Sequence, residues 1–180
     1  MSVDISPVIA ATTYWLTRAY PAVGGPFSTA LAEAQARQAA TVAAWLRYPT
    51  STDAALLLLV GPGGAARLDR LALGDLSEPA VRDQPWRTWV DEVVTSWAAC
   101  LLTDSALAVA AVAALESAEH CQGLPVEFRR LTHPDERDRQ AAALLRHPDL
   151  LAPVADLHRA ALLERLDIAD TRGTGALDAA

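Results

Sequence analysis

The chain has 180 residues and a formal net charge of −7, with 52% hydrophobic and 21% charged residues. This composition excludes an intrinsically disordered chain, and the length is sufficient for one domain with a sizeable core. The acidic balance argues against nonspecific binding to DNA, RNA or anionic membranes, because such binding requires a surface that neutralises phosphate charge. We therefore predict neither a nucleic-acid partner nor a membrane partner.

Hydrophobic periodicity predicts an all-α protein, with a single-domain bundle of about six or seven helices over residues 1–169 and a flexible tail at 170–180. Residues 1–7 lack a basic region followed by an apolar core and a cleavage site, so we expect no export signal and a cytoplasmic location. In that compartment Cys100 and Cys121 are expected to be free thiols rather than a disulfide.

The first helix is predicted to end near residue 20, before Pro21, and a second helix is predicted from Ser28 to about residue 48. Gln35 and Gln38 fall within the apolar stripe of this second helix. A buried glutamine needs hydrogen-bond partners. We therefore favour a position at the margin of the stripe for both side chains.

Residues 53–60 form a short apolar run, which periodicity alone assigns equally well to a buried strand or a buried helix. A helix capped by Thr52 or Asp53 is favoured, because no other strand candidate exists to pair with the run. The glycine-rich loop at 61–64 that follows lacks the spacing of nucleotide-binding loops. A short helix is then predicted over residues 65–73.

The clearest pattern covers residues 85–121 and predicts an antiparallel helical hairpin at the centre of the fold. Apolar side chains from 86 to 101 fall on one helical face. The second helix, 106–121, is expected to be capped by Asp104 and Ser105. It is also expected to be surrounded by protein, because its first ten residues include no polar side chain. The rest of the first helix surface is polar, formed by Arg87, Asp91, Glu92, Thr95 and Ser96.

Two helices are predicted in the C-terminal part of the chain. Thr132 and Asp135 resemble a capping box that starts a helix reaching about Arg146. Pro153 is expected to open the last helix, 153–168, which has two apolar strips. A helix that is apolar on two sides either lies between neighbouring helices or contributes to an oligomer interface.

The candidate site residues fall into two groups. Trp86, Trp89 and Trp97 could line an aromatic pocket for an apolar or planar ligand, although membership of the core is favoured for these rings. Glu116 and His120, four residues apart on one helical face, are the best metal candidates. Metal sites in helical bundles need more ligands than this pair, so a surface Glu–His pair is favoured, and no cofactor is predicted.

The sequence contains no recognisable arrangement for nucleophilic catalysis, so an enzyme is not favoured. By elimination we predict a non-catalytic interaction or adaptor protein. It would be a homodimer or a subunit of a larger assembly, with the helix at 153–168 as the expected contact. The alternative is a helical small-molecule-binding protein or enzyme whose pocket is lined by tryptophans.

Overall fold

The computed structural model describes the backbone of residues 4–73, 85–115, 118–121 and 127–175, and the side chains of these residues except 73 and 168–175. Within these ranges the fold is all-α, as predicted, and the one β-type contact is an isolated bridge between Gly64 and Asp91. The elements are α1 (Ser6–Ala19), α2 (Pro26–Arg47), α3 (Ser51–Val60), α4 (Ala65–Leu73), η2 (Pro85–Trp89), α5 (Glu92–Thr103), α6 (Ser105–Ala114), η4 (Glu119–Cys121), α7 (Arg129–Thr132), α8 (Glu136–Ala141), α9 (Pro148–Ala155) and α10 (Arg159–Gly175).

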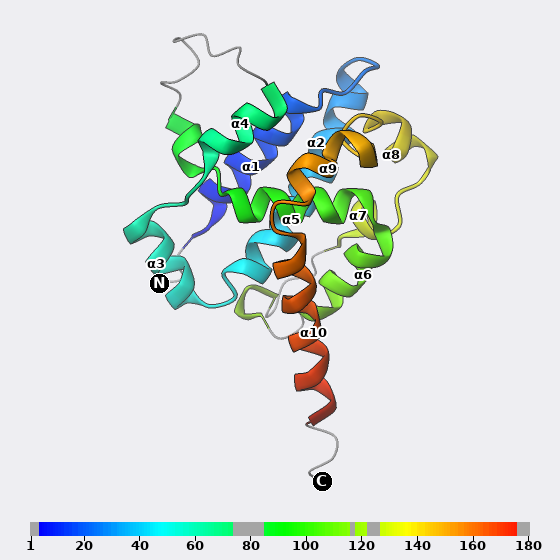
Figure 1. Ribbon diagram of the computed structural model, residues 1–180. Coiled ribbons are helices and arrows are strands. Elements are labelled where there is room, and N and C mark those ends of the chain that lie inside the picture. The colour runs from blue at the N-terminus through cyan, green and yellow to red at the C-terminus, as the bar shows by residue number, and fades with distance from the viewer. Residues whose placement is uncertain (1–3, 74–84, 116–117, 122–126, 176–180) are drawn as a thin grey trace.

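Helix α5 lies at the centre of the fold, between α2 on one side and α9 on the other (Figure 1). Every residue from Val94 to Leu102 is buried, so this helix has no solvent-facing side. The expected polar face is therefore wrong for α5. Thr95 and Ser96 are buried with their hydroxyls donating to the backbone carbonyls of Asp91 and Ala155.

The helix predicted from residue 86 is interrupted before it reaches α5. Residues Pro85–Trp89 form the 3-10 helix η2, and Asp91 has an extended backbone conformation. Its carboxylate oxygen Oδ1 accepts the N–H groups of Val93 and Val94 at 2.8 and 3.0 Å. An aspartate that satisfies these first-turn donors fixes the start of the helix at the next residue.

Helix α6 begins at the predicted cap, because Asp104 Oδ1 accepts the Leu107 N–H at 3.0 Å. It ends at Ala114 rather than at residue 121, and only Ala108 and Ala111 are buried within it. The prediction that protein surrounds this helix is wrong. Most of its residues are alanines, whose small apolar surface makes exposure inexpensive. Its antiparallel arrangement with α5 stays a prediction.

Helices α1 and α2 pack against each other, and α2 also packs along α5 (Figure 1). The α2 contact surface is rich in buried alanines, which allow the neighbouring helices to approach closely. This helix starts at Pro26 and its N-cap is Gly25, which lies three residues before the predicted cap, Ser28. Gly25 has a φ of +87°, a backbone conformation that residues with a Cβ rarely adopt.

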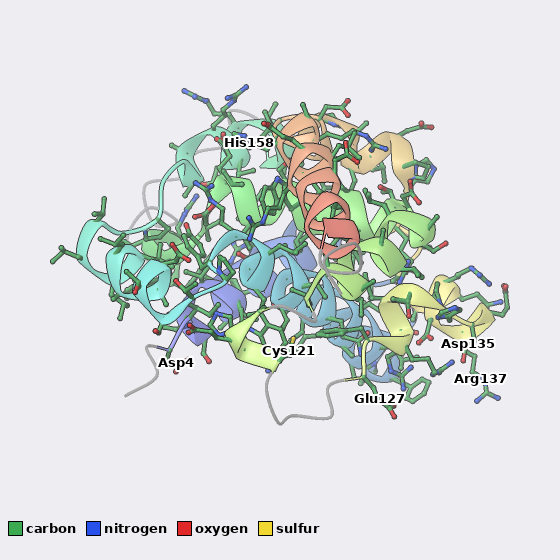
Figure 2. All side chains as sticks on the ribbon, turned by 90° about the horizontal axis from the view of Figure 1, so that it is seen from below. Asp4, Cys121, Glu127, Asp135, Arg137 and His158 are labelled. Carbon is green, nitrogen blue, oxygen red and sulfur yellow. The ribbon has the colours of Figure 1, made fainter. Side chains whose placement is uncertain are left out.

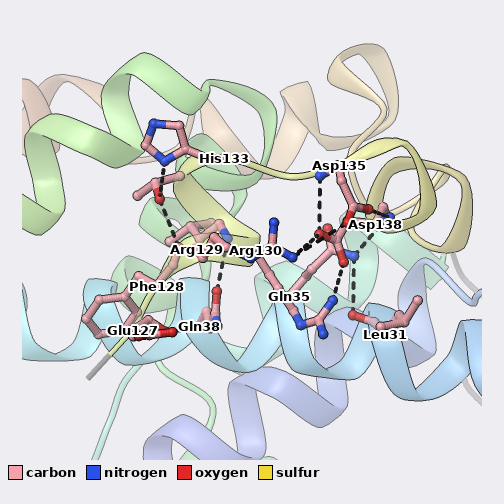
Figure 3. A network of polar contacts seen from close by, with 12 residues as sticks. Leu31, Gln35, Gln38, Glu127, Phe128, Arg129, Arg130, His133, Asp135 and Asp138 are labelled. Atoms are coloured by element: carbon pink, nitrogen blue, oxygen red, sulfur yellow. Dashed lines mark hydrogen bonds and ion pairs between the residues drawn. The ribbon is translucent and has the colours of Figure 1, made fainter. Parts of the chain in front are cut away.

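A network of buried polar groups joins α2 to the C-terminal half of the chain (Figure 3). Gln35 is fully buried, so its predicted marginal position is wrong. It donates to the Asp138 carbonyl at 2.8 Å and accepts from Arg146 Nε. The guanidinium of Arg146 also donates to the carbonyls of Leu102 and Arg130, at 3.0 and 2.6 Å. Burial lowers the Arg146 pKa to about 10.

The helix predicted from Thr132 to Arg146 is reduced to α8 and a turn at 142–146, and Thr132 is instead the last residue of α7. The capping box lies three residues later than expected. Asp135 accepts the Asp138 N–H at 2.8 Å, and the Asp138 carboxylate accepts the Asp135 N–H at 3.2 Å. Asp138 also pairs with Arg130 at 2.6 Å, so its buried charge is compensated.

The helix predicted at 153–168 is broken between α9 and α10 at residues 156–158. At the break, the N–H of His158 donates to Ser96 Oγ, and the His158 carbonyl accepts the indole N–H of Trp97. A continuous helix would need this N–H for its own hydrogen bond, whereas the His158 carbonyl accepts the Leu162 N–H of α10 at 3.2 Å as well as the Trp97 indole. Beyond the break, α10 buries Leu162 and Leu166 and its backbone runs to Gly175.

Among the described helices, none has both the length and the apolar character required to cross a membrane.

Candidate functional site

Helix α3 confirms the favoured helical assignment of the ambiguous apolar run, whereas the expected burial of this run is wrong. Its cap is Thr50 rather than Thr52 or Asp53. The Thr50 hydroxyl accepts the Asp53 N–H at 3.2 Å, and the Asp53 carboxylate accepts the Thr50 N–H at 3.1 Å. This reciprocal capping box satisfies two backbone donors at the start of the helix.

The apolar side chains of α3 are mostly exposed. Only Ala54 and Leu57 are buried, and they lie three residues apart on one narrow strip of the helix. Their neighbours on the rest of the surface are aliphatic, with exposed fractions of 54% at Leu56, 47% at Leu58, 83% at Leu59 and 81% at Val60. A helix in the interior of a fold would bury these residues.

The position of α3 explains this exposure. The helix lies at one edge of the molecule in both overall views, opposite the edge formed by Asp135 and Arg137 (Figures 1 and 2). It makes only sparse contacts with the other described helices. The aliphatic face of α3, formed by Leu56, Leu58, Leu59 and Val60, therefore has no covering element in the described part of the chain.

Polar contacts near its ends hold α3 in place. The Ser51 N–H donates to the Glu119 carboxylate at 3.0 Å, and the ring Nε2 of His120 lies 2.7 Å from the Tyr48 carbonyl. At the other end, the Gly63 carbonyl accepts the Glu92 N–H at 3.0 Å. The helix is thus fixed without burial of its aliphatic face.

The glycine loop after α3 is a packing element. Gly64 has a φ of +98°, and a Cβ built there would lie 2.5 Å from the Cβ of Glu92. A side chain at this position would therefore clash with the start of α5. Close packing against Glu92 therefore accounts for the glycine at this position, and a phosphate-binding role is not needed to explain it.

A pocket of about 310 Å³ lies between the C-terminal end of α2 and α3. One side is formed by aliphatic residues of α3. The other includes the Tyr48 hydroxyl, which donates to Asp91 Oδ2 at 2.5 Å, and the Arg47 guanidinium, which lies 5.7 Å from the centre of the Tyr48 ring. The lining residues are Arg47, Tyr48, Asp53, Leu56, Leu57, Val60 and Gly61.

Two side chains that line the pocket carry a charge at neutral pH, Arg47 and Asp53. Arg47 is exposed and forms no ion pair with any described residue. Burial is the main cause that raises the pKa of Tyr48 above its ordinary value, and the hydrogen bond to Asp91 is the second cause. The hydroxyl of Tyr48 is therefore a neutral donor already engaged with Asp91.

The three tryptophans predicted as a possible pocket have different surroundings. Trp97 is 3% exposed within the core, and its indole N–H donates to the His158 carbonyl at 3.1 Å. Trp86 packs on Tyr14 with ring centres 4.5 Å apart, and Trp89 is half-buried. None of the three lines the pocket beside α3. The tryptophan-lined site stays a prediction.

The predicted metal pair cannot be assembled from the described residues, because Glu116 lies outside them. His120 has its Nε2 against the Tyr48 carbonyl and its ring stacked on Trp45, with ring centres 5.7 Å apart. In the described ranges, no group of three or more His, Cys, Asp or Glu side chains is arranged to hold a metal ion.

Both cysteines are free, as predicted. Cys100 is buried in the core, with its sulfur 3.3 Å from the Ala155 carbonyl oxygen. Burial raises the pKa of this thiol to about 11. A thiol that keeps its proton in a closed site is a poor nucleophile, so Cys100 has a structural role.

Sequence reasoning missed one pair of ionisable side chains. Glu92 Oε1 lies 2.7 Å from His158 Nε2 and 3.6 Å from an Arg67 guanidinium nitrogen. The Glu92 side chain is 12% exposed and the His158 side chain 29%. The pair is separated by 66 residues, and no local motif announces a contact over such a distance.

A carboxylate that orients an imidazole is one half of a general-base arrangement, which also requires a hydroxyl or thiol as the reacting group. Ser96 offers a hydroxyl that contacts the backbone of His158. This hydroxyl donates its proton to the Ala155 carbonyl at 2.9 Å and accepts the His158 N–H, so both of its roles are already occupied. Glu92, Ser96 and Trp97 thus contact the side chain and the backbone of His158. This arrangement fastens the turn between α9 and α10 to α5.

Comparison of the chain with protein-family models, with curated proteins and with solved structures gives no match. Functional inference therefore depends on the geometry. The polar clusters around Arg146 and His158 have their partners within the chain, whereas the aliphatic face of α3 does not.

Proposed function

We propose that this protein is a non-catalytic interaction protein that binds another polypeptide through the aliphatic face of α3. The observation that supports the proposal is the exposure of Leu59 and Val60, at 83% and 81%. Burying a leucine or valine side chain stabilises a protein or complex by about 1.5–3 kcal/mol. The largest apolar patch on the surface of a monomeric protein is often functional, and contiguous exposed aliphatic residues of this kind are candidates for such a patch.

The proposal moves the expected contact away from the helix predicted at 153–168. In that region, Leu162 and Leu166 are buried against the fold, and Leu163 is 42% exposed. Leu59 exposes about twice that fraction, and three further exposed aliphatic residues lie beside it on the same helix. Helix α3 is therefore the better candidate. A cytoplasmic location stays a prediction from the sequence.

Site-specific photo-crosslinking in the host cell tests this proposal. A benzophenone amino acid at position 59 should give a covalent adduct with a second polypeptide, because this side chain lies at the centre of the exposed face. The matched control carries the same group in place of Arg37, whose side chain is 64% exposed on α2. No adduct at position 59, or equal adducts at both positions, would contradict the proposal.

A further inference from the structure

We infer that the polypeptide covering α3 is a second copy of this chain, paired about a two-fold axis. The inference rests on the proposed function, because it assumes that the aliphatic face of α3 is a docking surface. In a two-fold interface the same patch meets itself, so a contact from residue i to residue j recurs from j to i. The surface must therefore carry both members of each complementary pair.

The charges around the pocket meet this requirement. Arg47 supplies one positive charge and Asp53 one negative charge among the residues that line it. Both hydrogen bonds that the Asp53 carboxylate accepts, from Thr50 N–H and from the Thr50 hydroxyl, use Oδ2. Among the described residues, Oδ1 accepts none. Two copies facing each other can form two Arg47–Asp53 ion pairs across the axis.

The shape of the surface is also self-complementary. Leu59 does not line the pocket, but it lies about 60° around the helix from Leu56, which forms part of the wall. Each chain therefore presents an exposed leucine next to a concave site of about 310 Å³. This volume accommodates a leucine side chain, and Leu59 of each copy can enter the pocket of the other.

The size of the face predicts the strength of this dimer. Leu56, Leu59 and Val60 lie within about 100° of one another on the helix and expose on the order of 350 Å² per chain, so pairing through them would bury about 700 Å² in total. This total lies below the range of stable specific interfaces and is typical of weak, transient contacts. We therefore expect a reversible dimer with a dissociation constant in the micromolar range.

Analytical ultracentrifugation of the full chain between about 1 and 300 µM tests the pairing. We expect a monomer–dimer equilibrium whose dissociation constant rises at least about tenfold in the variant Leu59→Gln. The matched control is Leu163→Gln, which changes an exposed leucine on α10 and should leave the equilibrium unchanged. Circular dichroism verifies that both variants remain folded, as their exposure predicts.

A second pair of variants tests the charge contacts. Arg47→Asp should weaken the dimer by about tenfold, because two attractive contacts across the axis become repulsive. Adding Asp53→Asn removes the repulsion while retaining an oxygen for the capping box, and should restore part of the affinity. A dimer that is insensitive to Leu59→Gln and Arg47→Asp, or one disrupted by Leu163→Gln, would overturn the inference.

A protein that remains monomeric at the highest concentration would also overturn self-pairing. The crosslinking experiment then separates the two hypotheses. An adduct between position 59 and a different protein would leave the proposed interaction function intact and refute only the second copy. A monomer with no adduct at position 59 would refute both.

Discussion

Helices α3 and α5 are both rich in apolar residues, yet the fold uses them in opposite ways. Helix α5 includes Thr95 and Ser96 and buries both of them, whereas α3 exposes four aliphatic side chains. Burial here follows from the number of neighbouring helices rather than from the apolar content of the segment. A strongly apolar helix without an amphipathic pattern can therefore belong either to the core or to an interface.

The means of attachment differ in the same way. Helix α5 is held along its length by side chains packed from α2 and α9, and its polar groups are hydrogen-bonded to the backbone. Helix α3 is held by the buried strip of Ala54 and Leu57 and by polar contacts near its ends, such as that between Ser51 and Glu119. This attachment leaves the side of the helix that carries Leu59 available for another molecule.

The largest expected contrast between the two helices comes from truncating one leucine in each. Leu101 is fully buried in α5, so Leu101→Ala should lower the free energy of unfolding by about 2–5 kcal/mol through lost burial and a cavity. Leu59→Ala on α3 should change it by less than about 0.5 kcal/mol in dilute monomer. Urea unfolding followed by circular dichroism measures both values.

Similar losses in the two variants would contradict this contrast. A large loss in Leu59→Ala that depends on protein concentration would instead report dissociation of the proposed dimer, because oligomers are stabilised by mass action. Measurements at two protein concentrations distinguish these outcomes.

Much of the helical organisation could be predicted because it depends on local signals. Helix α4 occupies the predicted range 65–73, and α6 starts at the predicted Asp104 cap. The break between α9 and α10 could not be predicted, because the His158 N–H donates to Ser96 on a distant helix instead of within a continuous helix. Likewise, the burial of Gln35 depends on Arg146, which lies 111 positions along the chain.

The candidate site was only partly accessible from the sequence. The apolar run at 53–60 is evident in the sequence, but a run of this length is compatible with a helix in the core and with a helix at the surface. The decisive fact is that few other helices lie near it, and this is a property of the whole packing. The tryptophan pattern does not separate a pocket from the core, because aromatic residues are common in cores, and Trp97 lies in the core.

Removing the N-cap of each helix should produce a smaller contrast than the leucine truncations. Asp91 caps α5 and also accepts the Tyr48 hydroxyl, so Asp91→Ala should cost about 2–3 kcal/mol. Thr50→Ala removes the cap of the peripheral helix α3 and should cost no more than about 1 kcal/mol. Chemical unfolding provides the comparison.

Asp91→Ser serves as the control for that experiment, because serine can still cap the helix but cannot reach Tyr48 in the same way. We expect it to recover about half of the stability that alanine loses. If serine and alanine destabilise the protein equally, capping does not contribute at Asp91. If Thr50→Ala costs as much as Asp91→Ala, then α3 is as strongly coupled to the core as α5.

The smallest expected effect concerns the hydrogen bond between Tyr48 and Asp91, which links the pocket beside α3 to the start of α5. Tyr48→Phe should lower the free energy of unfolding by about 1 kcal/mol at pH 8. Folding raises the pKa of Tyr48 above its ordinary value of 10.0, so the folded protein holds this proton more tightly than the unfolded chain does. The stabilisation that accompanies this shift is complete below about pH 10 and declines as the pH rises further.

The difference between the wild type and Tyr48→Phe should consequently narrow when unfolding is measured at pH 11 instead of pH 8. Tyr14→Phe removes a hydroxyl from an exposed tyrosine and controls for the loss of that group alone, with a small expected effect. A Tyr48→Phe difference of the same size at both pH values would show that the hydroxyl does not couple folding to its ionisation. The connection between the two helices would then depend on the backbone contacts of Gly63 and Gly64 with the start of α5 rather than on Tyr48.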